Sequence, residues 1–372
     1  MSRLKLAVIG AGHLGRIHTR LASANPDFEL VAVVDPDEEA RNSLAEEFSA
    51  IPLAHHDQLD QTIAAAILAS PTHTHHAVAI ELLERGVHLF VEKPLTTDSF
   101  QGRQLVETAL TKGATLQVGH VERFNPAFRA VESYTSSPKY IEALRTSSYT
   151  FRSTDIGVVM DLMIHDLDVV LSLVQSELVS THAIGISIFG EHEDMAQARL
   201  HFLNGCVVNL TASRSSFVSQ RSMQIFTETG YAKIDFANHK AAIIRPNEKL
   251  TRREINFAML SPDQKQFVQD TLFDEYLRLE ELPVGTGNAI QDEQQDFIES
   301  IREGRQPRVS GQQGLETISI AEQILDSIAS HRWTSIAAGP SGAMATPEAI
   351  ILPGPQPATT SESQNTPRRK AG

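Results

Sequence analysis

Four polar side chains mark one face of an otherwise apolar helix that the sequence predicts over residues 158–174. Asp161, His165, Asp168 and Ser172 follow one another at spacings of four, three and four residues, which places them on one side of an α-helix. Because burying carboxylates and an imidazole without partners costs free energy, we expect this stripe to face a cleft. There His165 could transfer protons near neutral pH, its pKa tuned by Asp161. A satisfied polar network in the core is the alternative.

The segment VEKPL at residues 91–95 ends a predicted strand. Proline disfavours the helical conformation of the residue before it, so Lys93 is expected to be extended. A pair such as Glu92–Lys93 at a strand end is often only a solvated ion pair. Its position at the same edge of the sheet as the glycine-rich loop described next favours a functional role.

The motif GAGHLG at residues 10–15 is a complete G-x-G-x-x-G between a predicted strand and a predicted helix. Gly10 permits the tight turn, Gly12 lets a pyrophosphate approach the backbone, and Gly15 allows the helix to pack closely on the strand. The start of the helix supplies free N–H groups and the positive end of a dipole. A glycine turn without nucleotide, an FAD site and an S-adenosylmethionine site remain alternatives.

Asp35 ends the second predicted strand, 20 residues after Gly15, where an acidic side chain can bind ribose hydroxyls. A carboxylate repels a 2′-phosphate, and the next residues, Pro36, Asp37 and Glu38, offer no compensating arginine. The sequence therefore favours NAD over NADP.

The segment SPTHTHH at residues 70–76 follows another predicted strand, at the end where open α/β sheets bind ligands. Pro71 and Thr72 are expected near the nicotinamide half of a dinucleotide. His73 and His76 could pair on a metal, but no acidic helix motif accompanies them. We interpret the segment as the first turn of a helix with polar caps, and we predict no metal site.

Two patterns of elements would position these residues. In residues 1–120, predicted strands at 3–9, 28–35, 64–70, 87–93 and 114–120 alternate with predicted helices at 13–24, 37–49, 73–85 and 98–112. This alternation predicts an N-terminal Rossmann domain with a doubly wound parallel sheet.

In residues 121–335 the helix at 158–174 is followed by predicted strands at 178–190, 195–203, 206–214, 221–228, 231–236 and 241–245, and by helices near 289–303 and 312–331. Turn signals between the strands predict an α+β domain with an open, mainly antiparallel sheet and helices on one face. The polar residues 246–288 could form an arm with a short helix near 263–280. The fold class overall is α/β.

Composition narrows the function classes. Lys and Arg number 32 and Asp and Glu 46, so the net charge of −14 disfavours a nucleic-acid partner. The single cysteine, Cys206, excludes an intramolecular disulfide and a multi-cysteine zinc site. Without a long apolar run or a signal-peptide core, we expect a cytoplasmic protein with no membrane partner. Residues 336–372 are predicted to be a disordered tail.

With these motifs in place, residues 3–331 resemble the Gfo/Idh/MocA family, which includes glucose–fructose oxidoreductase and inositol dehydrogenase. The resemblance rests on GAGHLG, Asp35, SPTHTHH, EKP at 92–94 and the D-x-x-x-H of Asp161 and His165. It implies an NAD(P)-dependent dehydrogenase acting on CH–OH groups, with Lys93, Asp161 and His165 as the catalytic set. The glucose–fructose oxidoreductases carry tyrosine in place of His165, so the histidine favours the dehydrogenases. The expected cofactor-binding residues are Gly10, Gly12, His13, Leu14, Gly15, Asp35, Ser70, Pro71, Thr72, His75, Glu92 and Lys93.

Residues 119–128 and 209–216 resemble the branch that oxidises UDP-linked amino sugars at the 3-position, including UDP-N-acetylglucosamine 3-dehydrogenases, which supply lipopolysaccharide precursors. The resemblance places Arg123, Asn125 and Arg214 near the substrate, and the planar fork of arginine suits a diphosphate. The alternative is that Asn125 only starts a helix and Arg214 pairs with an acid.

The expected mechanism divides the work among three side chains. His165 would accept the hydroxyl proton during hydride transfer, Asp161 would orient His165, and Lys93 would stabilise negative charge on the oxygen. If burial lowers its pKa, Lys93 could take the proton itself.

Two rival functions stay open. An inositol or free-sugar dehydrogenase would not need Arg123 and Arg214, because a neutral polyol carries no phosphate. A non-catalytic, nucleotide-sensing regulator would not need the catalytic set. We expect a small sugar or nucleotide-sugar partner, and a homodimer or homotetramer packed through the second sheet.

Overall fold

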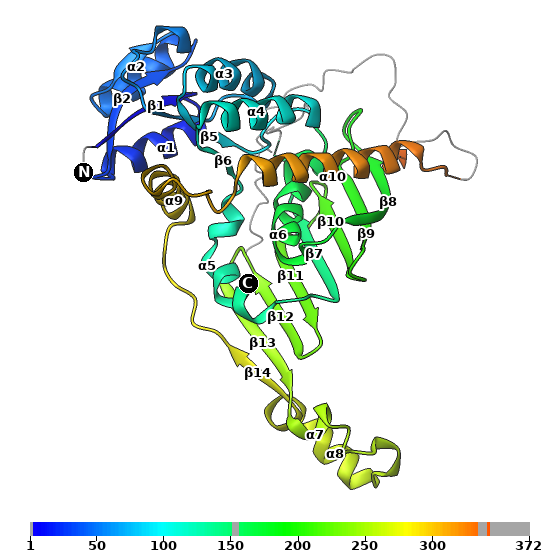
Figure 1. Cartoon of the computed structure of the whole chain (residues 1–372). Coiled ribbons are helices and arrows are strands. Elements are labelled where there is room, and N and C mark those ends of the chain that lie inside the picture. Colours follow the sequence, from blue (N-terminus) through cyan, green and yellow to red (C-terminus); the bar gives the residue numbers. More distant parts are fainter. Residues whose placement is uncertain (1–2, 151–155, 334–340, 343–372) are drawn as a thin grey trace, which may run out of the picture. The chain divides into compact units, whose positions relative to one another are not determined.

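The alternating N-terminal pattern forms the predicted parallel sheet in the computed structural model, which describes residues 3–150, 156–333 and 341–342. Within these residues, six strands lie in the order β3-β2-β1-β4-β5-β6, and every neighbouring pair is parallel. Figure 1 labels β1, β2, β5 and β6 of this sheet, in blue to cyan. Their bounds are β1 Leu4–Ile9, β2 Phe28–Val34, β3 Ile51–Leu53, β4 Ala65–Leu68, β5 His88–Glu92 and β6 Leu116–Gly119. The order reverses between β1 and β4, where open sheets of this kind bind nucleotides.

Helices cover both faces of this sheet. Their bounds are α1 His13–Ala24, α2 Glu38–Glu47, α3 Thr72–Glu84 and α4 Ser99–Lys112, with a short turn η1 at His56–Gln58. Two later helices, α9 (Ala289–Glu303) and α10 (Gly311–Ser330), also pack here. Phe297 of α9 and Ile318 of α10 belong to the two cores on either side of the sheet. The C-terminal helices therefore join the two halves, and the predicted division at residue 120 stays a prediction.

A second sheet is built from nine strands of the described residues, in the order β14-β13-β12-β11-β7-β10-β9-β8-β15. Their bounds are β7 Tyr140–Thr146, β8 Leu178–Ser187, β9 Met195–Phe202, β10 Val207–Ser213, β11 Gln220–Thr227, β12 Gly230–Asp235, β13 Lys240–Pro246, β14 Leu277–Glu281 and β15 Ser341–Gly342. The six predicted strands are present and the sheet is mainly antiparallel, as expected. The sequence analysis missed β7, a central strand that runs parallel to β10.

One face of the second sheet carries the core. The helices α5 (Pro126–Val131) and α6 (Ile164–Val174), together with α10, pack on the buried side chains of the strands. The predicted helix at 158–174 begins as a π-helical turn, η4 (Val159–Met163), before α6 continues it. Short turns flank α5 at η2 (Val121–Phe124) and η3 (Glu132–Tyr134). This packing holds the first turns of η4 and α6 beside the end of β5.

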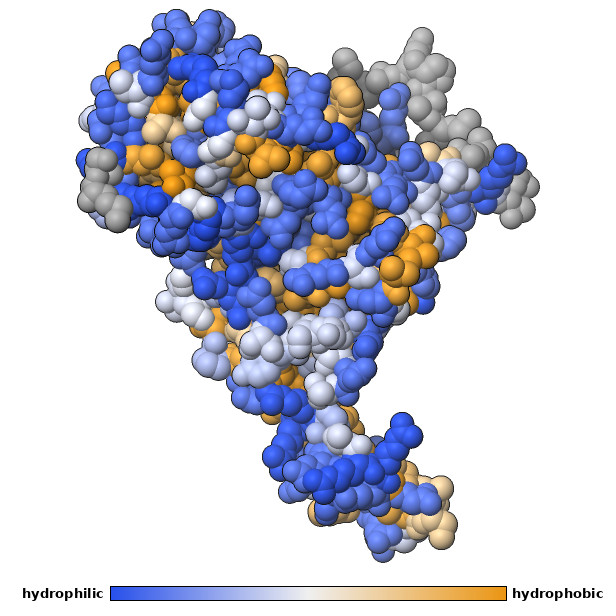
Figure 2. Space-filling view, viewed as in Figure 1, coloured by the Kyte–Doolittle hydropathy of each residue, from blue (hydrophilic) through white to orange (hydrophobic). Residues whose placement is uncertain are grey.

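The predicted arm lies between β13 and β14. It contains α7 (Glu248–Thr251), η5 (Phe257–Met259), α8 (Pro262–Asp270) and η6 (Leu272–Tyr276), so the helix expected at 263–280 ends early. Figure 2 shows hydrophobic side chains on the surface of this arm. The exposed large hydrophobic residues of the arm are Phe257, Met259, Phe267 and Phe273.

The disorder predicted for residues 336–372 falls, apart from Ser341–Gly342, outside the described residues. Among the helices that the structure describes, none has the length and apolar character needed to cross a bilayer.

The glycine-rich loop between β1 and α1 leaves little room at two of its three glycines. Gly10 has a φ of +104°, and a Cβ there would lie 2.6 Å from the carbonyl oxygen of Ala69. A Cβ on Gly15 would overlap the carbonyl oxygen of Gly10. A Cβ on Gly12 would meet no protein atom within 4 Å. Gly10 and Gly15 are therefore required by the fold itself, whereas Gly12 keeps a space open in front of the helix.

Gly15→Ala should lower the free energy of unfolding by about 1–3 kcal/mol, because the added methyl group forces the Gly10 carbonyl to move. The matched variant Gly12→Ala should change it by less than about 0.5 kcal/mol, since its methyl group enters open space. Urea unfolding followed by circular dichroism measures both. Equal destabilisation by the two variants would contradict this account of the loop.

Candidate active site

The loop at residues 10–15 offers an anion-binding helix start. Gly12 is the N-cap of α1, and no side chain caps the free N–H groups of its first turn. Such groups bind phosphate, and the space in front of Gly12 lets a phosphate approach them. His13 and Leu14, in the first turn, are exposed. These residues fit the pyrophosphate of a dinucleotide.

Asp35 lies directly beside this loop. Its Oδ2 accepts a hydrogen bond from the Ala11 N–H at 2.7 Å, and its Oδ1 accepts one from the Asp37 N–H at 2.8 Å. Both oxygens keep a free lone pair, so the carboxylate can still accept a ribose hydroxyl. The same contacts hold the carboxylate of Asp35 beside the glycine-rich loop.

The residues after β4 form the second part of the expected cofactor site. Pro71 is the N-cap of α3, which starts at Thr72, and the hydroxyl of Ser70 bonds to that of Thr74 at 2.6 Å. His75 is buried, and its ring nitrogens lie 2.9 Å from the Ser70 carbonyl and 3.0 Å from that of Pro94. Burial lowers the pKa of His75, and the two carbonyl contacts oppose this shift. The ring connects the end of β4 with the loop after β5.

The end of β5 carries Glu92 and Lys93. The Lys93 Nζ donates to the carbonyl oxygen of Asp161 at 2.9 Å and lies 3.4 Å from its Oδ1. Asp161 belongs to η4 and His165 to the first turn of α6. The structure thus brings together Lys93, Asp161 and His165. Lys93 follows a strand of the first sheet, whereas Asp161 and His165 lie on the helix that packs on the second sheet. Lys93 and His165 are 72 residues apart in the sequence.

His165 sits in a field of positive charge. Its pKa lies well below the ordinary value, first because of burial and then because of the charges of Lys93, Arg145, His120 and Arg221. Its buried Nδ1 has no hydrogen-bond partner among the described residues. At neutral pH the ring is therefore uncharged and able to accept a proton.

The expectation that Asp161 orients His165 is not met in this structure. The carboxylate of Asp161 pairs with the ammonium of Lys93, because Lys93 reaches it from the end of β5. Burial, followed by the charges of nearby cations, lowers the pKa of His165. Asp161 is therefore placed to hold Lys93.

The polar stripe on the helix divides into two parts. Asp161 and His165 lie beside Lys93, whereas Asp168 is buried and lies 3.6 Å from the Nη1 of Arg123. The hydroxyl of Ser172 donates to the Val169 carbonyl of its own helix at 2.6 Å. The later half of the stripe thus contacts Arg123 and its own helix, although the buried Oδ2 of Asp168 has no hydrogen-bond partner among the described residues.

The three expected substrate residues are all held by the protein. Arg123 is buried beside Asp168, and the amide of Asn125 caps α5 by accepting from the Ala127 N–H at 3.0 Å. Arg214 is buried and donates to Asp194 at 2.6 Å. The alternative weighed for Asn125 and Arg214, a helix start and an ion pair with an acid, describes their contacts here. Their role toward substrate stays a prediction.

Sequence reasoning missed a buried ion network beneath the helix. Arg145 of β7 makes two hydrogen bonds of 2.8 Å to Asp166 of α6 and one of 3.0 Å to Glu122. Burial raises the pKa of Asp166, against the opposing charge of Arg145. The alternation Ile141, Ala143, Arg145 in the missed strand is the signal that points to this arginine.

A second missed feature is a chain of buried polar groups behind Lys93. The Nε2 of His18 bonds to Oε1 of Glu92 at 2.7 Å, and the Lys93 N–H donates to Oε2 at 3.2 Å. The amide nitrogen of Gln294 lies 2.9 Å from the Nδ1 of His18 and 3.2 Å from its carbonyl oxygen. Because that amide donates to Nδ1, the ring proton is on Nε2 and points at Glu92. The chain fixes the backbone of Lys93.

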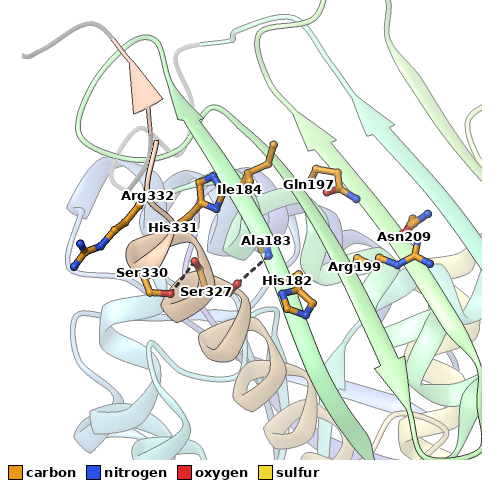
Figure 3. A pocket seen from close by; sticks show the side chains of 10 residues that line it. All are labelled: His182, Ala183, Ile184, Gln197, Arg199, Asn209, Ser327, Ser330, His331 and Arg332. Atoms are coloured by element: carbon orange, nitrogen blue, oxygen red, sulfur yellow. Dashed lines mark hydrogen bonds between the residues drawn. The ribbon is translucent and has the colours of Figure 1, made fainter. Parts of the chain in front are cut away.

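A hollow at the end of α10 lies elsewhere. Figure 3 shows its lining, in which the hydroxyl oxygen of Ser327 accepts from the Ala183 N–H at 2.8 Å. Arg199 and Asn209 line it from the strands, and none of its lining residues belongs to the expected site. The catalytic residues expected from the sequence therefore lie around Lys93 and not in this hollow.

Comparison with known proteins gives two matches to one family. Residues 4–120 match the sequence model described as an oxidoreductase family with an NAD-binding Rossmann fold, and residues 129–336 match its C-terminal alpha/beta domain. The UDP-N-acetylglucosamine 3-dehydrogenase of Acidithiobacillus ferrooxidans is 37% identical over 240 residues, which cover 64% of this chain and 76% of that protein. The inositol 2-dehydrogenase of Rhizobium meliloti is 24% identical over 90% of this chain and 99% of its own length.

A solved structure of the same Acidithiobacillus ferrooxidans enzyme superposes with a TM-score of 0.77 and 31% identity, covering 88% of this chain and 98% of that one. The helix that carries Asp161 and His165 lies within the family match at residues 129–336. The chain therefore belongs to the Gfo/Idh/MocA oxidoreductase family and is a dehydrogenase with a nicotinamide-nucleotide domain.

Proposed function

We propose that this chain oxidises the 3-hydroxyl of a UDP-linked N-acetyl amino sugar, with NAD as the hydride acceptor. The observation that carries the proposal is the contact of Lys93, at the end of β5, with Asp161, which lies four residues before His165 on the same helical segment. The relative that is 37% identical, a UDP-N-acetylglucosamine 3-dehydrogenase, supports the choice of substrate.

The residues around the glycine loop would hold the cofactor. The start of α1 suits the pyrophosphate, Asp35 suits a ribose hydroxyl, and the segment after β4 suits the nicotinamide half. When bound, the nicotinamide supplies a hydride acceptor. We assign the cofactor as NAD because the Asp35 charge disfavours a 2′-phosphate.

The three catalytic side chains have separate roles in this proposal. His165, uncharged at neutral pH, takes the proton of the reacting hydroxyl. The Lys93 ammonium donates a hydrogen bond to the same oxygen and stabilises negative charge developing there. Asp161 holds the Lys93 Nζ through its carbonyl and its carboxylate, so that the ammonium stays in one orientation.

Inositol or free-sugar oxidation is the second candidate. The full-length coverage of the Rhizobium meliloti inositol 2-dehydrogenase favours it, as do the internal ion pairs of Arg123 and Arg214. A panel of UDP-sugars, free sugars and inositols, each assayed by NADH fluorescence, separates the two. Turnover of polyols in preference to UDP-N-acetylglucosamine would overturn the proposed substrate. Absence of turnover with the whole panel would favour a nucleotide-sensing regulator.

For the cofactor, wild-type protein should bind NAD more tightly than NADP. Asp35→Ser combined with Pro36→Arg should reverse this order, because the double change replaces a repelling carboxylate with a phosphate-binding guanidinium. Fluorescence titration of the two reduced nucleotides gives the dissociation constants. Tighter binding of NADP by the wild type would refute the assignment.

Lys93→Met and His165→Ala should each lower kcat by about 10²–10⁴-fold, with NAD affinity nearly unchanged. The acidic limb of kcat/KM should lie below about pH 6.5 in the wild type, since burial and then the surrounding cations disfavour the imidazolium ion of His165. The limb should move to higher pH in Lys93→Met, because removing the ammonium raises the pKa of His165. It should vanish in His165→Ala. A limb that survives in His165→Ala and vanishes in Lys93→Met would assign the base to Lys93.

We also propose that the chain is a cytoplasmic homodimer or homotetramer packed through the second sheet. Ile184, Ile186 and Met195 are half-buried on the face opposite the core. Met195→Glu should dissociate the oligomer, because it puts a charge into the contact, whereas Leu110→Glu on the exposed side of α4 should not. Light scattering at micromolar concentration measures the mass. A monomeric wild type would contradict the proposal.

A further inference from the structure

On the neighbouring strands β7 and β11, the row of side chains that faces the core ends in an arginine. Arg145 continues the buried row of β7, and Arg221 continues the row of β11 that contains the buried Met223 and Ile225. Arg145 and Arg221 are direct cross-strand partners, so their side chains leave the sheet on the same face. That face carries α6, since Arg145 reaches Asp166. Arg221 therefore points to the side of the sheet on which His165 lies.

Arg221 differs from the other cations near the start of α6. Four of these are held by carboxylates, in the pairs Lys93–Asp161, Arg123–Asp168, Arg145–Asp166 and Arg214–Asp194. Arg221 is exposed, and its guanidinium makes no ion pair or hydrogen bond within residues 3–150, 156–333 and 341–342. It is the cation in this set that remains available to a ligand.

Among the described residues, Arg221 adds an unpaired charge to the side of the sheet that carries α6. It stands directly opposite Arg145, whose own charge is already balanced by Asp166 and Glu122. Its charge also reaches the catalytic helix, where it adds to burial and to the charges of Lys93, Arg145 and His120 in lowering the pKa of His165. An anion in front of Arg221 would balance this remaining charge.

We propose that Arg221 binds the diphosphate of the nucleotide-sugar substrate and thereby selects nucleotide sugars over free sugars. The inference rests on the function proposed above. A guanidinium fork matches two phosphoryl oxygens. The chain as a whole, with a net charge of −14, repels a diphosphate, so binding requires a local cation. Arg221 fills the role that the sequence analysis gave to Arg123 and Arg214.

The test compares Arg221→Gln with a matched control, Lys233→Gln. Lys233 lies on the adjacent strand β12 and is exposed, but its neighbours Ala232 and Ile234 face the core, so Lys233 points to the opposite face of the sheet. Both variants remove one positive charge. Arg221→Lys keeps the charge but loses the fork, so its affinity should fall between those of the wild type and Arg221→Gln.

Calorimetric titration should give a dissociation constant for UDP that is roughly 10- to 100-fold higher in Arg221→Gln, as expected for losing a charge-assisted hydrogen bond. Binding of uridine and of NAD should be unchanged in that variant. The KM for UDP-N-acetylglucosamine should rise by a similar factor, with kcat within a few-fold of wild type. Lys233→Gln should match the wild type in every measurement.

The outcomes separate this inference from the proposed function. If the wild type oxidises UDP-N-acetylglucosamine and Arg221→Gln binds UDP equally well, the inference alone fails. If Arg221→Gln weakens the binding of uridine by the same factor as the binding of UDP, the contact is with the nucleoside. If it weakens the binding of glucuronate, titrated as a further ligand, but not that of UDP, the contact is with a sugar carboxylate. Either result overturns the diphosphate assignment. If the wild type binds no UDP, both the inference and the proposed substrate fail.

Discussion

The contact between Lys93 and Asp161 is the interaction on which the arrangement of this enzyme depends. Lys93 stands at the carboxyl end of a parallel strand, where such sheets present ligands, and Asp161 begins the helix that fills the core of the second sheet. One ammonium therefore links the half that suits a nucleotide to the half that carries His165. Both side chains are less than a quarter exposed, so dissolved salt screens the pair weakly.

The buried charged side chains around α6 are held in ion pairs. Asp166 and Glu122 neutralise Arg145, and Asp194 neutralises Arg214, all with little access to water. Removing one partner from such a pair leaves a buried charge and destabilises the protein strongly. This network keeps the helix in one position while leaving the imidazole of His165 among cations, where it stays uncharged. Arg145, which helps to hold α6 in position, thus also lowers the basicity of His165.

Local patterns were sufficient for much of the fold and for the candidate site. The period of the stripe placed Asp161 and His165 together, and strand-end reasoning placed Lys93 and the glycine loop at one edge of the sheet. These inferences work because they depend on neighbours along one helix or on the shared direction of parallel strands.

Long-range pairing was out of reach of the sequence. With 46 carboxylates in the chain, nothing local shows that Asp166 belongs to Arg145 or Asp194 to Arg214. The strand β7 was missed because its buried row contains only Ile141 and Ala143 before it reaches an arginine. In the arm, the helical pattern ended at Asp270, and the following residues form η6 and β14 instead. Phe297 of α9 packs on the first sheet although it follows the second sheet in the sequence, and this too depends on contacts between distant segments.

The chain of Gln294, His18 and Glu92 has a consequence for how this protein can change. Its members come from α9, α1 and β5, so the backbone of Lys93 is supported by residues from both ends of the sequence. A hybrid that took residues 1–120 from a relative would keep the bond between positions 18 and 92 but would need a matching amide at position 294 from the other parent. The two halves are therefore not freely interchangeable modules, and recombination between relatives would succeed only where all three positions are inherited as a compatible set.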